Sequence, residues 1–288
     1  VLDLFGLTAE EARQRFPAIY QHLLDHVWPE RRENKRKVRR DNWWLFGETN
    51  PKLRRQLSDL SRFVATVETS KHRTFQFLDH AILPDNKLIA IAVEQAWIHG
   101  VLSSRVHQVW VSPDALGSLL ESRPVYVKSA CFETFPFPVP LDSQKQRIGD
   151  LAEQLDAHRK KQLAAHPKLT LTGMYNILEK LRTGETLTQK DKTIHEQGLV
   201  GVLKELHDEL DAAVAEAYGW PADLSDDEIL EQLLALNLER AAEERAGKIR
   251  WLRPEYQNPD GKDPSTQAEI AVAAQEEAKK ATKPKLPT

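Results

Sequence analysis

The segment FPFPVP at residues 135–140 divides the chain into two parts with different sequence patterns. Proline has no backbone N–H and a fixed φ angle, so alternating prolines end both helices and strands. Short runs typical of strands precede the segment, whereas apolar residues recur at helical spacing after it. From about residue 254 the chain becomes rich in Asn, Asp, Pro, Gly, Lys and Ala. We therefore expect one domain at residues 1–140, a helical domain at 141–255 and a flexible linker or tail at 256–288.

The first part contains patterns of both helices and strands. Thr8 followed by Glu11 is a capping-box pattern, and the apolar spacing after it predicts one or two helices to about Lys37, with a bend at Pro17. The runs FVATVE, TFQFL and KLIAIAV are rich in β-branched and aromatic residues and predict a small mixed sheet. A tight turn is expected at LPDN, residues 83–86.

Residues 98–110 are expected to form a further helix with one buried face. The polar residues that we place largely on its other face are Ser103, Ser104, Arg105, His107 and Gln108. After residue 141, narrow apolar seams include Ile148, Leu151 and Leu155. Ser225 with Glu228 is a second capping box. The predicted fold class is α+β, with a small mixed α/β domain followed by a mostly α-helical one.

Composition excludes several classes of protein. A chain of 288 residues with 41% hydrophobic and 29% charged residues can bury one large or two modest cores. Cys131 is the only cysteine, which excludes an internal disulfide and a thiolate zinc cluster and favours a reducing cytoplasm. No apolar run approaches the length that spans a bilayer, so we expect no membrane role.

The net charge of −3 is unevenly distributed. Residues 1–140 contain 19 Lys and Arg against 16 Asp and Glu, whereas the remainder contains 21 against 27. The densest basic run is RRENKRKVRR at residues 31–40, which suits a polyanion such as DNA but is equally compatible with a solvated helix end. The residues predicted to contact phosphates there are Arg36, Lys37, Arg39 and Arg40.

Motifs for catalysis and cofactor binding are absent from the sequence. The 12 glycines show neither GxGxxG nor P-loop spacing, and no Asn-Pro pair is followed by the proline and aromatic residue that grip a flipped base. His22 and His26 have the i, i+4 spacing of metal ligands but no third ligand nearby, so a helix-surface pair is the preferred interpretation. We therefore predict no catalytic, cofactor-binding or metal-binding residues in this chain.

The chain also carries a series of longer, ordered motifs. They are NWWLFG at 42–47, TSKHRTFQFLD at 69–79, LPDNKLIAIA at 83–92, GVLSSRVHQVW at 100–110, CFETFPFP at 131–138, YNILEKLRTGETLTQKDKTIHEQGLV at 175–200 and AYGWPADLSDDEIL at 217–230. With them, residues 8–255 resemble the C-terminal half of the large single-chain DNA adenine methyltransferases of bacterial restriction-modification and phage-defence systems. The target-recognition domain of that family is named after the MmeI enzyme.

The resemblance implies that residues 1–140 read a target sequence in double-stranded DNA. It also implies a parent enzyme whose upstream Rossmann-like methyltransferase domain binds S-adenosylmethionine and methylates adenine N6. Residues 111–130 depart from the family pattern, since only Tyr126, Lys128 and Ser129 keep its Tyr-x-Lys-Ser run. Base-reading residues differ among members with different targets, so no specificity code is transferred.

The candidates for DNA contact in this region form two sets. Arg123, Tyr126 and Lys128 lie in the variable stretch and are predicted to read base edges. The residues of the family-like segments, predicted to hold phosphates or to brace the fold, are His72, Arg73 and Arg105. Lys71 together with His72 and Arg73 is the next candidate for base reading.

Other interpretations stay open at this point. Trp43 and Trp44 suit a buried hinge better than a base-stacking platform. The helical part either clamps DNA or braces the recognition domain, and its excess of acidic residues favours bracing. A free-standing nuclease or transferase would need clustered acidic and lysine side chains at strand ends. A helical protein-interaction subunit of a DNA-modification complex would dock its partner through the seam Leu203, Leu206, Leu210 and Val214.

Overall fold

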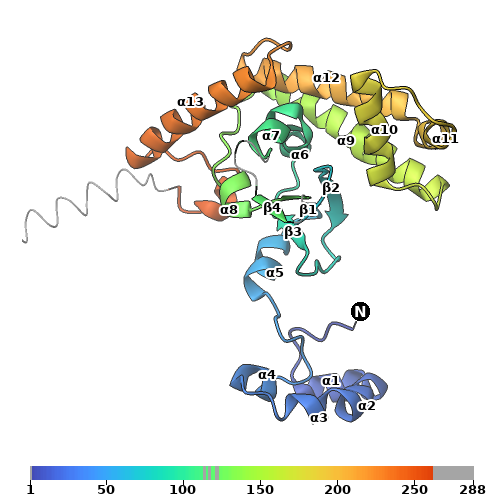
Figure 1. Cartoon of the computed structure of the whole chain (residues 1–288). Helices are drawn as coiled ribbons and strands as arrows, with labels where there is room; N and C mark the ends of the chain where they lie inside the picture. Colours follow the sequence, from blue (N-terminus) through green and yellow to red (C-terminus); the bar gives the residue numbers. More distant parts are fainter. Residues whose placement is uncertain (1, 113–114, 116–117, 121–122, 262–288) are drawn as a thin grey trace, which may run out of the picture. The chain divides into compact units, whose positions relative to one another are not determined.

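The computed structural model describes residues 2–261 except 113, 114, 116, 117, 121 and 122, with the backbone alone at 118–120 and 123. The chain forms two compact units, Val1–Ser58 and Asp59–Thr288, and Figure 1 labels most of their elements. The first unit consists of short helices, namely α1 Ala9–Arg15, α2 Pro17–His26, α3 Trp28–Arg31, α4 Lys37–Asp41 and α5 Pro51–Leu57.

Local sequence signals explain the helices of the first unit. Thr8 and Glu11 form the predicted capping box at the start of α1, and Pro17 occupies the first turn of α2, where its missing N–H costs no hydrogen bond. Trp43 is 8% exposed and its ring lies 5.4 Å from that of Tyr20. The indole Nε1 of Trp44 donates to the carbonyl of Leu7 at 2.9 Å. The two tryptophans are therefore structural, as predicted.

The second unit begins with a three-stranded sheet of β1 Arg62–Val67, β2 Gln76–Asp79 and β3 Leu88–Ile91, in the order β2-β1-β3. The three predicted strands are confirmed. Both neighbours run antiparallel to β1, so the prediction of a mixed sheet was wrong. Periodicity locates strands but carries no information on the direction in which the chain returns.

The predicted turn between β2 and β3 is confirmed at Asp85. Its carboxylate accepts a hydrogen bond from the backbone of Lys87 at 2.7 Å, and its carbonyl accepts one from Leu88 at 3.2 Å. Such an Asx turn stabilises a tight connection. A separate hairpin is formed by β4 Ser118–Leu120 and β5 Arg123–Val125, which are also antiparallel.

Two helices, rather than one, follow the sheet. They are α6 Ala96–Ser103 and α7 Arg105–Trp110, separated at Ser104, whose backbone is extended and whose hydroxyl donates to the carbonyl of Val101. Ser103, Ser104 and His107 are all buried, so the prediction of a polar outer face was wrong. The break changes the direction of the chain, and the sheet and the later helices enclose both helices.

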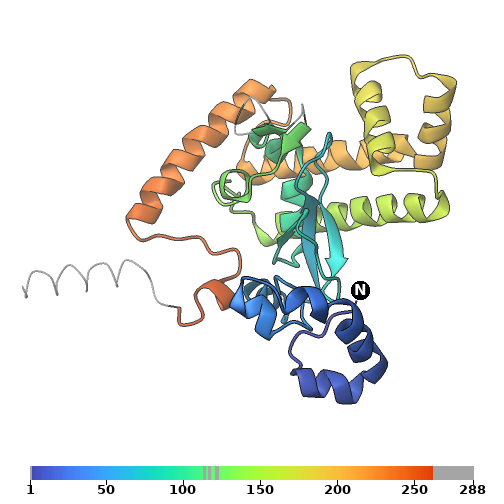
Figure 2. The same cartoon turned by 60° about the horizontal axis from the view of Figure 1, so that its bottom comes forward.

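The remaining elements are helical, in agreement with the helical pattern predicted after residue 141, and one short helix precedes that point. They are α8 Lys128–Cys131, α9 Asp142–Ala165, α10 Leu171–Thr183, α11 Gln189–Gly198, α12 Val200–Tyr218, α13 Asp226–Arg245 and α14 Pro254–Gln257. Ser225 and Glu228 form the predicted capping box of α13. Figure 2 shows α9 and α12 side by side, with α13 extending away from them.

One hydrophobic core continues from the sheet into these helices. Val64 and Phe77 of the sheet belong to the same cluster of buried side chains as Ile98 of α6, Ile148 of α9 and Leu203 of α12. The division predicted at residue 140 therefore lies inside the second unit and does not coincide with the edge of either compact unit. The prolines at 136–140 end regular structure without separating two cores.

The C-terminal segment also returns to the sheet. Arg253 is 5% exposed and donates to the carbonyl of Ala92, just after β3, at 3.0 Å. Short helix α14 follows at Pro254–Gln257, partly within the predicted tail, and residues 262–288 lie outside the described residues.

Candidate nucleic-acid interface

Two segments that are about 50 residues apart in the sequence are joined at one end of the sheet. The backbone N–H of Tyr126 donates to the carbonyl of Glu68 at 2.8 Å, and that of Ser70 donates to the carbonyl of Pro124 at 3.2 Å. Thr69 and Val125 form an antiparallel bridge between these bonds. We call residues 68–73 and 123–128 together the recognition end. The structure thereby brings both sets of predicted DNA-contacting residues at 71–73 and 123–128 into one place.

Two predicted residues of the recognition end have exposed side chains. Lys71 lies on the loop after β1, with 57% of its side chain exposed, and Lys128 is exposed at the start of α8. The backbone of Arg123 pairs with Leu120 in the β4–β5 hairpin, whereas its side chain lies outside what the structure describes.

The loop after β1 is fastened to α10. The ammonium of Lys71 lies 2.7 Å from Oδ1 of Asn176 and 3.1 Å from Oε2 of Glu179. Nε2 of His72 lies 2.8 Å from the same Asn176 oxygen. Although Lys71 pairs with Glu179, its side chain is largely exposed. The Lys71 ammonium therefore remains accessible to an anion.

Tyr126 was predicted to read base edges, and Arg73 to hold phosphates or to brace the fold; both side chains are buried. Arg73 is 9% exposed and Tyr126 is 2% exposed. Nε2 of His107 lies 3.0 Å from the Tyr126 hydroxyl, and the Arg73 guanidinium stacks over the Tyr126 ring at 5.1 Å. Neither side chain reaches the surface in this arrangement, so the structure assigns both to the support beneath the recognition end.

Burial controls the titration of this support. Desolvation lowers the pKa of His107 to about 3 and, with the repulsion of Arg73, keeps the imidazole neutral. Desolvation also raises the pKa of the Tyr126 hydroxyl and lowers the pKa of Arg73. Beneath the recognition end, the buried side chains of His107 and Tyr126 are therefore neutral, and the Arg73 cation lies beside them.

Arg105 braces two helices. Its Nε lies 2.8 Å from the Asp226 carboxylate, and its NH1 donates to the carbonyl of Leu224 at 2.8 Å, so it ties α7 to the start of α13. Of the two roles predicted for Arg105, the structure favours bracing.

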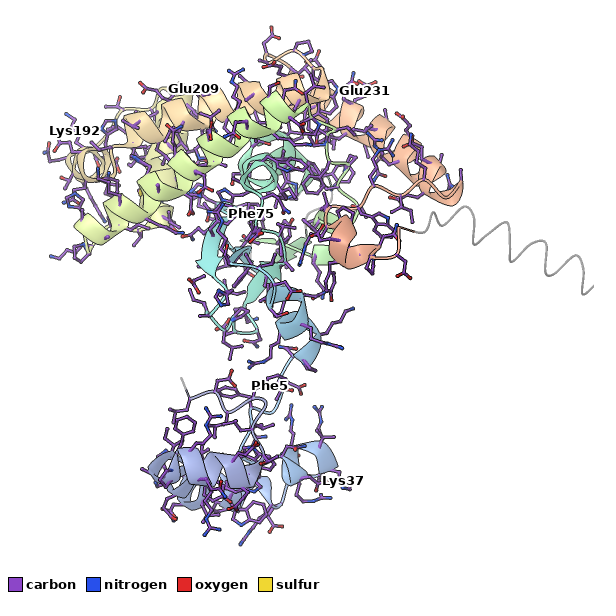
Figure 3. The ribbon with its side chains drawn as sticks, turned by 180° about the vertical axis from the view of Figure 1, so that it is seen from behind. Phe5, Lys37, Phe75, Lys192, Glu209 and Glu231 are labelled. Carbon is purple, nitrogen blue, oxygen red and sulfur yellow. The ribbon has the colours of Figure 1, made fainter. Side chains whose placement is uncertain are left out.

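The basic run of the first unit is partly neutralised by its own carboxylates. Arg36 lies 3.3 Å from Glu48, which also pairs with Arg39, and Lys37 pairs with Asp41. Arg40 donates to the carbonyl of Asn34 at 3.0 Å. Arg36 and Lys37 nevertheless keep 70% and 78% of their side chains exposed, and Figure 3 labels Lys37 on the surface of this unit. A surface ion pair of this kind exchanges readily for a phosphate contact.

Lys87 was missed as a candidate by sequence reasoning. It precedes β3, its ammonium lies 2.9 Å from the Glu68 carboxylate, and this contact raises the pKa of Lys87. Glu68 begins the recognition end, so Lys87 adds an exposed cation beside it. Its position at the start of a strand was visible in the sequence, but the pairing with the end of β1 was not.

The described residues contain no candidate metal-binding cluster. Within residues 2–261 as described, no group of three or more His, Cys, Asp or Glu side chains is arranged to hold a metal ion. The rings of His22 and His26 lie 4.5 Å apart. In the same residues, no helix is both long and apolar enough to cross a membrane.

Comparisons with known proteins agree with this geometry. A family model described as the MmeI target recognition domain matches residues 7–139. The chain also matches a solved structure of the type IIL restriction-modification enzyme MmeI in complex with DNA, with a TM-score of 0.57 and 21% sequence identity. This match covers 84% of the chain and 29% of the MmeI chain, and at this identity it establishes the fold. No curated protein matches the chain. Residues 7–139 are therefore similar to the MmeI target recognition domain, and the chain shares the fold of the corresponding part of MmeI.

Proposed function

We propose that this chain is the sequence-reading, DNA-binding part of a restriction-modification enzyme. The observation that carries the proposal is the recognition end, where Lys71 and Lys128 are exposed and a buried layer of Arg73 and Tyr126 supports them. Base readout requires side chains held on a rigid support, and this support is fixed by backbone pairing. The similarity of residues 7–139 to the MmeI target recognition domain supports the same conclusion.

Two surfaces contribute differently to DNA binding. The exposed cations of the basic run, with Arg36 and Lys37 as its most exposed members, supply contacts to phosphates that any duplex offers. The recognition end supplies contacts that depend on base sequence, with Arg123 and Lys128 as the predicted readers. Affinity and specificity therefore respond to different substitutions.

The parent enzyme is, in this proposal, an S-adenosylmethionine-dependent adenine-N6 methyltransferase that acts in the bacterial cytoplasm in restriction-modification or phage defence. Its methyltransferase domain is the intramolecular partner of this chain and holds the cofactor. The motifs quoted above support this assignment, as does the 29% of the MmeI chain that the present chain spans.

The helical part braces the recognition domain. An interaction subunit would dock a partner through the seam Leu203, Leu206, Leu210 and Val214. Within the second unit Leu206 is partly buried against the core, and the other three are fully buried. Arg62 of β1 pairs with Glu153 of α9, which further ties the sheet to the helices. These contacts favour bracing over the alternative of a protein-interaction subunit.

Fluorescence anisotropy with a labelled duplex tests the proposal. We expect binding of any duplex at about 50 mM salt, with the logarithm of the association constant falling linearly with the logarithm of the salt concentration. Replacing Arg36 and Lys37 by Gln should weaken binding to all duplexes alike and flatten this slope by about 0.9 for each phosphate that is no longer neutralised. The matched control replaces Lys190 and Lys192, two exposed lysines of α11, in the same way. It should change neither the affinity for duplexes nor the salt slope. Absence of duplex binding at low salt would contradict the proposal.

A further inference from the structure

We propose that Arg73 is a positioning residue for sequence reading: its buried guanidinium sets the register between the loop at 68–72 and the β4–β5 hairpin. Arg73 thereby controls sequence selectivity without touching DNA. This inference rests on the proposed function and adds a specificity determinant to it.

The guanidinium of Arg73 joins the end of β1 to strand β5. NH1 donates to the hydroxyl of Thr66 at 3.1 Å and to the carbonyl of Val67, both on β1. NH2 donates to the carbonyl of Glu68 at 3.3 Å and to that of Pro124, on β5, at 3.2 Å. One rigid group therefore fixes the distance between the end of β1 and the hairpin.

Arg73 is itself anchored to the core. Its carbonyl accepts a hydrogen bond from Nε2 of Gln108 on α7 at 3.2 Å. The carbonyl of Glu68 is shared, because it also accepts the backbone N–H of Tyr126. Tyr126 in turn lies beside His107 of α7. Arg73 and Tyr126 thus connect α7 to both segments of the recognition end.

Only a planar fork of donors can make these contacts together. Lysine carries the same charge on a single ammonium, which cannot span the β1 acceptors and the hairpin carbonyl at once. Base discrimination requires side chains placed within about 0.5 Å of their working positions. An Arg73→Lys variant should therefore keep the charge that attracts DNA and lose the register that reads it.

Selection from a library of duplexes with a randomised central region tests this inference on the full chain. Sequencing of the bound fraction gives the selectivity, and anisotropy with the unselected library gives the overall affinity. We expect the wild type to enrich one motif. Arg73→Lys should bind the unselected library within about threefold of the wild type, with selectivity at one or more positions reduced by tenfold or more, about 1.4 kcal/mol.

Arg105→Lys is the matched control, because Arg105 also forks between two elements but lies outside the recognition end. It should lower stability and leave the motif unchanged. If Arg73→Lys does not fold by circular dichroism, Thr66→Val decides instead, since it removes one guanidinium acceptor while keeping the side-chain shape. Thr66→Val should then reduce selectivity at the same positions.

The outcomes separate the inference from the proposed function. A motif that survives Arg73→Lys, or Thr66→Val in its place, overturns the inference alone. Equal loss of the motif in Arg105→Lys also overturns it, because the effect would then be one of general stability. A wild type that binds duplexes but enriches no motif overturns the proposed function and the inference with it.

Discussion

The ammonium of Lys160 on α9 lies 2.7 Å from the carbonyl oxygen of Phe77, on the outer side of edge strand β2. One turn earlier, the Asp156 carboxylate accepts the backbone N–H of Phe77 at 3.4 Å. Arg159 donates to the carbonyl of Phe75 at 2.7 Å. An edge strand exposes unpaired backbone groups that invite wrong pairing, and three side chains of α9 cover them here. Figure 3 labels Phe75, whose buried side chain lies between the sheet and the helices.

Asp156→Ala should strongly destabilise the second unit. The Asp156 side chain is 7% exposed and lies 3.6 Å from the Arg159 guanidinium, which is 1% exposed. Its removal leaves Arg159 buried without its nearest counter-charge, and such a change costs about 3–5 kcal/mol. Urea unfolding followed by circular dichroism measures the change. Asp150→Ala, at an exposed position of the same helix, should change the free energy of unfolding by less than about 0.5 kcal/mol; equal effects of the two would show that Asp156 has no special role.

These contacts explain why the division predicted at residue 140 lies inside one compact unit. The prolines at 136–140 correctly predicted the end of the strand-rich region and the start of the helices. They carried no information on where α9 packs, and α9 packs on the sheet and on α6. The helix-breaking residues therefore marked a change of local structure within one compact unit.

Gly100→Ala should destabilise the contact between α6 and α9. A Cβ atom at Gly100 would lie 2.6 Å from Cγ2 of Ile148 and 3.0 Å from the Ile148 carbonyl oxygen, so the backbone of α9 would have to move. Overpacking of this kind costs about 1–3 kcal/mol. Thermal unfolding compares it with Gly201→Ala, where no atom lies within 4 Å of the added methyl group. The control should be neutral or stabilising by up to about 1 kcal/mol, and a Gly100→Ala variant as stable as this control would refute the close approach.

Stability should fall as the pH is lowered through the titration of three buried histidines, His99, His107 and His207, because burial lowers the pKa of each. Burial lowers the pKa of His99 to about 4 and that of His107 to about 3, from an unperturbed 6.5. Because the folded-state pKa values are the lower ones, the contribution is complete above pH 6.5 and is lost as the pH falls toward 4. Each histidine adds about 1.4 kcal/mol per pH unit in that window.

Asp211 opposes this trend in part, because burial raises its pKa to about 6 and the folded state therefore binds a proton first as the pH falls. Urea unfolding between pH 7 and pH 5 measures the net slope. His107→Asn should reduce the slope of the free energy of unfolding against pH by about 1.4 kcal/mol per pH unit. An unchanged slope would mean that His107 titrates normally in the folded chain.

Lys128→Ala should change base preference at one position of the target rather than affinity for all duplexes. Lys128 is exposed at the recognition end, and removal of a hydrogen bond from lysine to a base edge costs about 1–3 kcal/mol at that base pair. Competition between duplexes that differ at single positions measures the preference. The Lys190→Ala variant of α11 is the control. A uniform decrease in affinity for every competitor would make Lys128 a phosphate contact instead.

The candidate site was predictable in its members but not in its arrangement. Residue types identified Lys71, Arg73, Tyr126 and Lys128, and the structure places all of them at the recognition end. The burial of Arg73 and Tyr126 could not be predicted; an arginine that satisfies backbone carbonyls, for example, has the same sequence signal as one that binds phosphate. Residue Lys87 was overlooked for a related reason, since its proximity depends on the pairing of β3 with β1.

Amide hydrogen exchange of the full chain, with and without a saturating duplex at low salt, locates the surfaces that contact DNA. We expect slower exchange on DNA binding at residues 68–72 and 124–128 of the recognition end and at residues 35–40 of the basic run, with α11 and α12 unchanged. Slower exchange confined to α12 and α13, with the recognition end unaffected, would contradict this expectation.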